Sequence, residues 1–337
     1  MIHRLRLRNF KGVVEGEAEL DKLTILVGPN NSGKTTILEA LFLAPNPFRQ
    51  VPYIPHIAVQ LLAGLHKTFH LAEGYSFLLN RYTANEAVIE CDEKEMIFTK
   101  EMGRILLYTN YEISGLQQTR INGRELFIMG ALGYNNDEAG GYSSRHVLPN
   151  SLLFSTKLVG FAHEYLRLKW MDFVNSGATA IVAKDVSRFV NEEYTNITAE
   201  PFVGGVLSLF AMLSDGTRVR LSDLGAGVHL YIVNRLLYEH YKPEVVLWDD
   251  LETHLNPRLL SHVAEWFADL VEEGRQVVVS THSLEVTDTL TTFVKDATVL
   301  LTSLKDGKLK ARKIKPDELR EWSEAGIDPR LAESFLL

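Results

Sequence analysis

The feature that most constrains the fold is a glycine-rich stretch near the start of the chain. The segment Gly28-Pro-Asn-Asn-Ser-Gly-Lys-Thr has two glycines followed by Lys and Thr at the spacing of a P-loop. An apolar run, Leu23 to Val27, precedes it, and Thr35 to Phe42 has the pattern of a helix. Backbone N–H groups and the helix N-terminus bind phosphate in this arrangement. The sequence therefore predicts a strand, a phosphate-binding loop and a helix.

Each residue type in the loop has an expected task. Gly28 and Gly33 let the backbone curl towards phosphate oxygens. Lys34, on a loop expected to face solvent, would place its charge on the β and γ phosphates. Thr35 would supply a hydroxyl ligand for Mg²⁺, and Thr36 would contact the α-phosphate side. A glycine turn that binds nothing is the alternative, and the complete motif argues against it. The predicted nucleotide-binding residues of the loop are Gly28, Pro29, Asn30, Asn31, Ser32, Gly33, Lys34, Thr35 and Thr36.

The last third of the chain alternates between helical and strand patterns. After a helix from Val228, the pattern predicts a strand at Val245 to Trp248, a helix at Pro257 to Glu273, a strand at Gln276 to Ser280 and a helix at Leu284 to Thr291. Such alternation is typical of a parallel α/β sheet. The sheet would therefore be assembled from both ends of the chain.

Acidic and polar residues follow two of these apolar strands, where α/β sheets bind ligands. Asp249 is the predicted Mg²⁺ ligand, and Asp250 is predicted to position and deprotonate the attacking water, with Glu252 as second candidate. A solvated Asp pair that caps the helix starting near Pro257 is the alternative. His282 could donate a hydrogen bond to the γ-phosphate, although a lone histidine is more often structural.

The middle of the chain and its tail have a different pattern. Antiparallel strands are predicted at 87–90, 95–100, 104–108, 118–121, 199–213 and 219–221, and helices at 158–170 and 183–194. Gly133 to Ser144 is predicted to be a mobile loop, and the tail a strand pair around Asp306-Gly307 and a helix from Pro316 to Ala325. The domains would be an N-terminal lobe with a β subdomain (1–150), a helical and β insertion (151–227) and a C-terminal lobe (228–337).

Composition excludes several classes of protein. The formal charge of −8 argues against a surface that is positive throughout, although a local basic groove for DNA is permitted. Arg4, Arg6 and Arg8 alternate with apolar residues, as in a strand with a solvated charged face. The lone Cys91 fits a reducing compartment. Without a signal peptide or an apolar run of about 18 residues, a cytoplasmic protein without membrane contact is expected.

Four segments in this order resemble the ATP-binding-cassette (ABC) superfamily, particularly its soluble branch with RecF, the SMC proteins and the OLD-family ATPase domains. The segments are Leu7-Arg-Asn-Phe-Lys with the phosphate loop, Leu221-Ser-Asp-Leu-Gly-Ala-Gly-Val-His, Trp248-Asp-Asp-Leu-Glu-Thr-His-Leu-Asn-Pro and Ser280-Thr-His-Ser. The resemblance implies an α/β P-loop ABC-type ATPase head with an antiparallel β subdomain and a helical subdomain. It also implies ATP and Mg²⁺ as cofactors, and adds Lys11 to the nucleotide-binding residues.

In such families the signature motif of one head caps the ATP held by the phosphate loop of another. The resemblance therefore implies that Ser222, Gly225 and Gly227 act in trans and that ATP drives a homodimer. The position usually held by a catalytic Glu is Asp250, so hydrolysis is expected to be slow. A glutamine that senses Mg²⁺ has no clear counterpart in this chain.

Three functions are compatible with these features. The first is an ATP-switched dimeric head in DNA maintenance, repair or defence that drives a separately encoded nuclease or effector, because the tail is expected to be too short for the Toprim nuclease domain of OLD proteins. The second is an interaction module that binds ATP without hydrolysing it. The third is the nucleotide-binding subunit of a transporter, which would normally show a Leu-Ser-Gly-Gly-Gln signature.

Overall fold

The computed structural model describes most of the chain. The described residues are 1–66, 75–101, 104–111, 119–121, 124–129, 147–205, 207–328 and 330–331. The loop predicted at Gly133 to Ser144 lies outside them.

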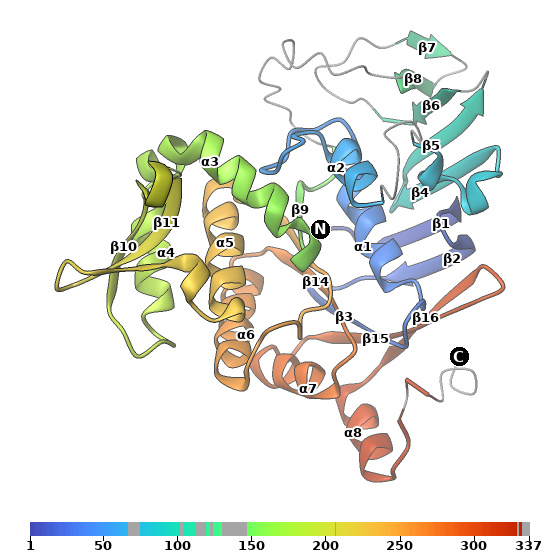
Figure 1. The fold of residues 1–337 in the computed structure, drawn as a ribbon. Coiled ribbons are helices and arrows are strands. Elements are labelled where there is room, and N and C mark those ends of the chain that lie inside the picture. Colours follow the sequence, from blue (N-terminus) through green and yellow to red (C-terminus); the bar gives the residue numbers. More distant parts are fainter. Residues whose placement is uncertain are drawn as a thin grey trace.

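A long mixed sheet runs through the molecule, and helices pack against it (Figure 1). Its strands, in spatial order, are β7 (Thr119–Ile121), β8 (Arg124–Met129), β6 (Arg104–Thr109), β5 (Lys94–Glu101), β4 (Glu86–Cys91), β1 (Arg4–Phe10), β2 (Val13–Glu19), β16 (Lys308–Ile314), β15 (Thr298–Lys305), β3 (Leu23–Val27), β14 (Gln276–Thr281), β13 (Val245–Trp248) and β9 (Ser151–Phe154). The main helices are α1 (Lys34–Leu43), α2 (Ala58–Leu65), α3 (Val159–Asn175), α4 (Ala178–Val186), α5 (Ala226–Tyr241), α6 (Pro257–Glu272), α7 (Leu284–Phe293) and α8 (Pro316–Glu324).

The parallel part of the sheet joins the two ends of the chain, as the alternating pattern predicts. Strand β3 pairs in parallel with both β14 and β15, so that Ile25 lies between Val279 and Val299. Every residue of β3, β13 and β14 is buried. Strands covered on both faces read as continuous apolar runs, which is why their positions could be predicted. The phosphate loop and the two polar strand ends therefore lie on neighbouring strands.

The antiparallel strands β1, β2 and β4 to β8 continue the same sheet. Strand β1 pairs with β2 on one side and with β4 on the other. Its three arginines are exposed, as expected, but each forms an ion pair with a neighbouring carboxylate. The pairs are Arg4 with Glu17, Arg6 with Glu90 and Arg8 with Glu86. The strand therefore does not present a row of uncompensated positive charge.

The helical part of the molecule lies at the opposite end from β4–β8 (Figure 1). It holds α3, α4 and a three-stranded sheet of β10 (Tyr194–Pro201), β11 (Leu207–Leu213) and β12 (Arg218–Arg220). The helix predicted at Ala183 to Tyr194 is wrong, because α4 ends at Val186 and Tyr194 begins a strand. The Ser187 hydroxyl accepts a hydrogen bond from the Tyr194 N–H at 2.7 Å, which stabilises this change of direction.

A buried charged network joins three helices of this region. The carboxylate of Asp185 on α4 accepts hydrogen bonds from Tyr231 at 2.6 Å and Arg235 at 3.1 Å on α5, and contacts His262 on α6 at 3.2 Å. Burial alone would raise the pKa of Asp185, but the bond to His262 and the charge of Arg235 hold this pKa well below its ordinary value. The network thus favours the ionised carboxylate and orients the helices around it.

We expect Asp185→Asn to lower the free energy of unfolding by about 1–3 kcal/mol, because the buried Arg235 loses one of its two carboxylate partners and keeps only Glu239. The lowered pKa means that this stabilisation is present above the unfolded-state pKa and is lost as pH falls through the folded-state value. The difference between parent and variant should therefore shrink below about pH 4. Urea unfolding of both proteins at pH 7 and pH 3.5 measures this difference in the free energy of unfolding. Asp288→Asn, which breaks the exposed pair with Arg320, is the control and should cost less than about 1 kcal/mol.

Candidate nucleotide site

The loop between β3 and α1 has the backbone conformation of a phosphate cradle. Asn31 and Gly33 adopt positive φ angles of 62° and 91°. Gly33 is the N-cap of α1, no side chain caps this helix, and its first intrahelical bond runs from Ile37 N to Gly33 O. The N–H groups of the first helical turn therefore have no intrahelical acceptor and, with the helix dipole, favour an anion.

Contacts from the far end of the chain support the loop. The hydroxyls of Ser32 and Thr302 lie 2.8 Å apart, and Thr302 on β15 is fully buried. A Cβ on Gly28 would lie 2.5 Å from the carbonyl oxygen of Thr302. Gly28 is therefore required by packing. Sequence analysis did not identify Thr302, because a threonine inside a strand carries no local signal of such a contact.

Lys34 is buried, not solvent-facing as predicted. Its side chain folds over the loop and donates from Nζ to the carbonyl oxygens of Gly28 at 2.9 Å and Pro29 at 2.8 Å. Burial lowers the pKa of Lys34, while the charges of Asp250 and Asp249 oppose this effect. The ammonium group thus lies inside the loop, close to the acids at the end of β13.

The chain folds so that Thr35 and Asp249 meet. The Thr35 hydroxyl donates to the Asp249 carboxylate at 3.0 Å, although the two residues are 214 positions apart. Ser280 at the end of β14 donates to the same carboxylate at 2.6 Å and accepts a hydrogen bond from the backbone N–H of Asp250 at 2.8 Å. Ser280 thereby orients Asp249 towards the loop.

The next acid, Asp250, has a different environment. Its φ is 52°, its side chain is 46% exposed, and its Oδ1 lies 3.6 Å from Nε2 of His282. Burial, then the charges of Asp249 and Glu252, raise the pKa of Asp250, which makes it a better proton acceptor than an ordinary aspartate. The alternative helix-capping role is wrong, because the side chain of Asn256 caps α6.

Glu252 is occupied by contacts within the chain. Its two carboxylate oxygens accept hydrogen bonds from the Thr281 hydroxyl at 2.8 Å and from the backbone N–H of His282 at 2.6 Å. Thr281 is the last residue of β14, and His282 follows it directly. Of the two predicted candidates for the attacking water, Glu252 therefore has both carboxylate oxygens engaged within the chain, whereas the side chain of Asp250 is 46% exposed and faces His282.

The donor set suits Mg²⁺. A hydroxyl and a carboxylate are hard oxygen ligands of the kind this ion prefers, and it takes the rest of its octahedral shell from phosphates and water. Thr35 and Asp249 would hold it. No group of three or more His, Cys, Asp or Glu side chains is placed to hold a metal ion among the residues that the structure describes.

Comparisons with known proteins match both parts of this site. Residues 1–119, which include the phosphate loop, match a family model described as an AAA ATPase domain. Residues 176–288, which include Asp249, Asp250 and His282, match a model described as "AAA domain, putative AbiEii toxin, Type IV TA system". No curated protein sequence matches the chain.

Solved structures with similar folds include an SMC head bound to the C-winged helix domain of ScpA, with a TM-score of 0.50, 16% identity and coverage of 95% of this chain and 99% of the other. An SMC head with an extended coiled coil from Pyrococcus furiosus has a TM-score of 0.48 and 14% identity, covering 96% and 98%. The chain has the fold of an ABC-type ATPase head. The matched ATPase domains support ATP binding and hydrolysis as the chemistry of the head.

The predicted nucleotide ligand Lys11 is held within the head by two side chains. Its ammonium group donates to the Glu39 carboxylate on α1 and lies 2.8 Å from Nε2 of His66. Burial and the charge of Lys11 lower the pKa of His66 to about 4, so the ring is neutral at pH 7. Lys11 is thus held against the phosphate-loop helix by Glu39 and His66.

The signature residues fall into two groups. Ser222 and Gly225 are exposed, and a Cβ on Gly225 would meet no heavy atom within 4 Å. Gly227 is buried, and a Cβ there would lie 2.1 Å from the backbone oxygen of His254. Gly225 is the N-cap of α5, and no side chain caps this helix. The head therefore presents Ser222 and Gly225 outwards, while Gly227 lets α5 pack against the segment that follows Asp250.

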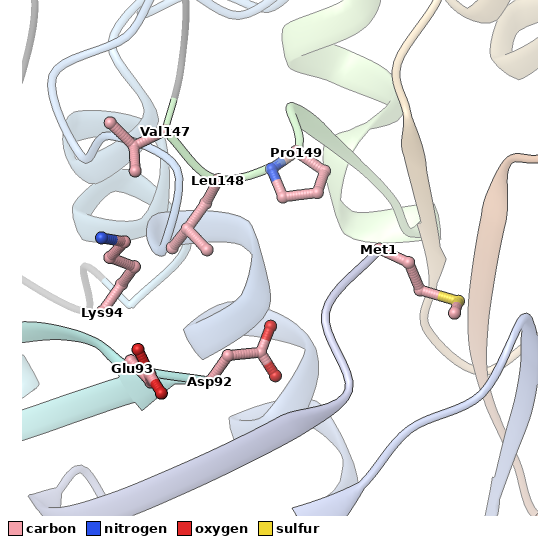
Figure 2. A pocket seen from close by; sticks show the side chains of 7 residues that line it. All are labelled: Met1, Asp92, Glu93, Lys94, Val147, Leu148 and Pro149. Atoms are coloured by element: carbon pink, nitrogen blue, oxygen red, sulfur yellow. The ribbon is translucent and has the colours of Figure 1, made fainter.

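A pocket of about 440 Å³ lies elsewhere, where the start of the chain meets the β4–β5 turn (Figure 2). Its lining residues are Met1, Asp92, Glu93, Lys94, Val147, Leu148 and Pro149. The Asp92 carboxylate accepts hydrogen bonds from the backbone N–H groups of His3 and Arg4. None of the predicted site residues lines this pocket.

Among the described helices, none is long and apolar enough to cross a membrane.

Proposed function

We propose that the head binds Mg·ATP at Gly28 to Thr36, hydrolyses it with Asp250, and uses bound ATP to associate with a second copy of the chain. The observation that carries the proposal is the contact between Thr35 and Asp249 beside an uncapped helix N-terminus. A turn that served only to connect β3 with α1 would have no need of a distant carboxylate at this place. ATP supplies the anion that such a site favours.

Each side chain has a role that follows from its position. Lys34 would exchange the carbonyl oxygens of Gly28 and Pro29 for β and γ phosphate oxygens, which carry more charge. Thr35 and Asp249 would hold Mg²⁺, and the bound ion would neutralise part of the phosphate charge. Asp250 would orient the attacking water and accept its proton, with His282 beside it to donate to the γ-phosphate.

The exposed signature supports association in trans. The N-terminus of α5 carries partial positive charge, and Ser222 adds a hydroxyl at the surface next to it. In a dimer these groups would meet the γ-phosphate held by the second copy. ADP lacks this phosphate, so association should depend on ATP.

Gly225→Val should spare ATP binding by the monomer but prevent ATP-driven association and hydrolysis, because the side chain has room in the monomer and would occupy the space of the γ-phosphate. Gly160→Leu is the matched control, since Gly160 is exposed on α3 with equally open surroundings. Light scattering with ATP and a fluorescent nucleotide titration measure the two properties. Hydrolysis by a Gly225→Val protein that stays monomeric with ATP would rule out the role of the signature in trans.

Mixing Gly225→Val with Lys34→Ala sharpens this test. A mixed dimer retains one composite site, made from the intact signature of the Lys34→Ala chain and the intact phosphate loop of the Gly225→Val chain. Partial ATPase activity should therefore return. If mixed dimers form by native mass spectrometry but remain inactive, the two sites must act together or the signature does not act in trans.

Turnover measured with and without DNA distinguishes the biological roles. Stimulation by DNA would support a head that works in DNA maintenance or defence with a separate effector. ATP-driven association without turnover under either condition would support an ATP-gated interaction module. Phosphate release by the purified parent protein, with Asp250→Asn as the blank, measures this directly.

A further inference from the structure

The peptide group of His282 is held on both sides by charged side chains. Its N–H donates to Oε1 of Glu252 at 2.6 Å. Its carbonyl oxygen accepts a hydrogen bond from Nη1 of Arg330, which lies after α8. Hydrogen bonds to charged groups are stronger than those between neutral groups. The backbone of His282 is therefore fixed from the segment after β13 and also from the C-terminal part of the chain.

Arg330 is oriented for this contact by Asp328. The Asp328 carboxylate accepts hydrogen bonds from Nε of Arg330 at 2.8 Å, from Nη2 at 2.5 Å and from its backbone N–H at 2.9 Å. This arrangement leaves Nη1 to reach the His282 carbonyl. A planar guanidinium can bind a carboxylate on one edge and a carbonyl on another, which a lysine ammonium cannot do.

The segment that carries Arg330 is itself anchored. Helix α8 is joined to α7 by an ion pair between Arg320 and Asp288 at 2.7 Å. After α8 the chain turns at Gly326, whose φ is 74°, and the N–H of Ile327 donates to the Trp322 carbonyl at 2.8 Å. Because α7 begins at Leu284, two residues after His282, these contacts place Arg330 in a defined position relative to the histidine.

We infer that Arg330 is a positioning residue for His282, which ties γ-phosphate recognition to the placement of the C-terminal segment. The inference rests on the role of His282 in the proposed function. With its backbone held between Glu252 and Arg330, the imidazole stays 3.6 Å from Asp250 and ready for the γ-phosphate. Without Arg330, only the N–H side of the peptide group remains held.

The expected consequence is a specific loss of γ-phosphate recognition. Arg330→Gln should lower kcat about 10- to 100-fold, since a misplacement of about 1 Å can cost about 100-fold. It should also lower the ratio of ATP to ADP affinity, while ADP affinity and the melting temperature stay at parent values. Arg330→Lys keeps a charged donor without the fork geometry and should recover part of kcat. A merely structural role would lower both nucleotide affinities and the melting temperature together.

The experiment compares full-length parent, Arg330→Gln, Arg330→Lys, His282→Ala and the Arg330→Gln, His282→Ala double variant, by steady-state ATPase assays and by titration with fluorescent ATP and ADP analogues. Arg167→Gln, which removes an exposed arginine ion pair on α3, is the control and should match the parent in kcat and in the affinity ratio. The double variant should be no worse than His282→Ala, because Arg330 acts through the histidine.

The outcomes separate this inference from the proposed function. If His282→Ala is impaired but Arg330→Gln matches the parent, the positioning role is wrong and the proposed function stands. An additive loss in the double variant also overturns it. If His282→Ala itself has parent activity and parent affinity ratio, the role of His282 in the proposed function is wrong, and this inference fails with it.

Discussion

Lys34→Ala is expected to abolish ATP binding, with a loss of at least about 3 kcal/mol, or about 100-fold in Kd, because two charge-assisted contacts to phosphate disappear. Since the Lys34 side chain is only 5% exposed and bonds to the loop carbonyls, alanine also removes packing from the loop. Isothermal titration with ATP and Mg²⁺ measures the affinity.

Lys34→Met provides the control for this prediction, because it keeps most of the aliphatic volume and removes only the charge. It should bind ATP as poorly as the alanine variant while melting at a temperature closer to that of the parent. If Lys34→Met retains parent affinity, the phosphate site is not where the loop predicts it.

Asp249→Asn and Asp250→Asn should give different phenotypes, because the structure gives the two acids different partners. Asp249 is buried and bonded to Thr35 and Ser280, so its variant should lose Mg²⁺-dependent nucleotide affinity. Asp250 faces His282 and is accessible, so its variant should bind ATP normally, accumulate as the ATP-bound dimer and lose about 10²–10⁴-fold in kcat. Nucleotide titration and single-turnover phosphate release distinguish them.

Glu252→Gln is the comparison for Asp250→Asn. Glutamine keeps one acceptor oxygen but cannot accept both the Thr281 hydroxyl and the His282 N–H on carboxylate oxygens, so a partial loss of kcat is expected. If Asp250→Asn hydrolyses ATP at the parent rate and Glu252→Gln is inactive, Glu252 and not Asp250 positions the water.

The sequence by itself determined the type of fold and the location of the glycine-rich loop that is proposed to bind phosphate. Gly28, Gly33 and Lys34 form a local pattern, because the loop conformation depends on residues that are neighbours in the chain. The buried strands β3, β13 and β14 were readable for a similar reason, since burial on both faces leaves a continuous apolar run. The sequence pattern did not predict the short helix α2, where local signals are weak. It also wrongly extended a helix beyond Val186, where α4 ends.

Only the tertiary structure decided which side chains are free to act. The sequence offered Asp250 and Glu252 as similar acids two positions apart, and only the packing of the chain engages Glu252 with the end of β14 and the residue that follows it. The structure likewise showed that Gly227 allows α5 to pack closely, whereas the surroundings of Gly225 are open. It also showed that Thr302 and Arg330 support the site from the last part of the chain. Such contacts join residues tens to hundreds of positions apart, so no local pattern encodes them; they exist because neighbouring strands bring their ends to the same edge of the sheet.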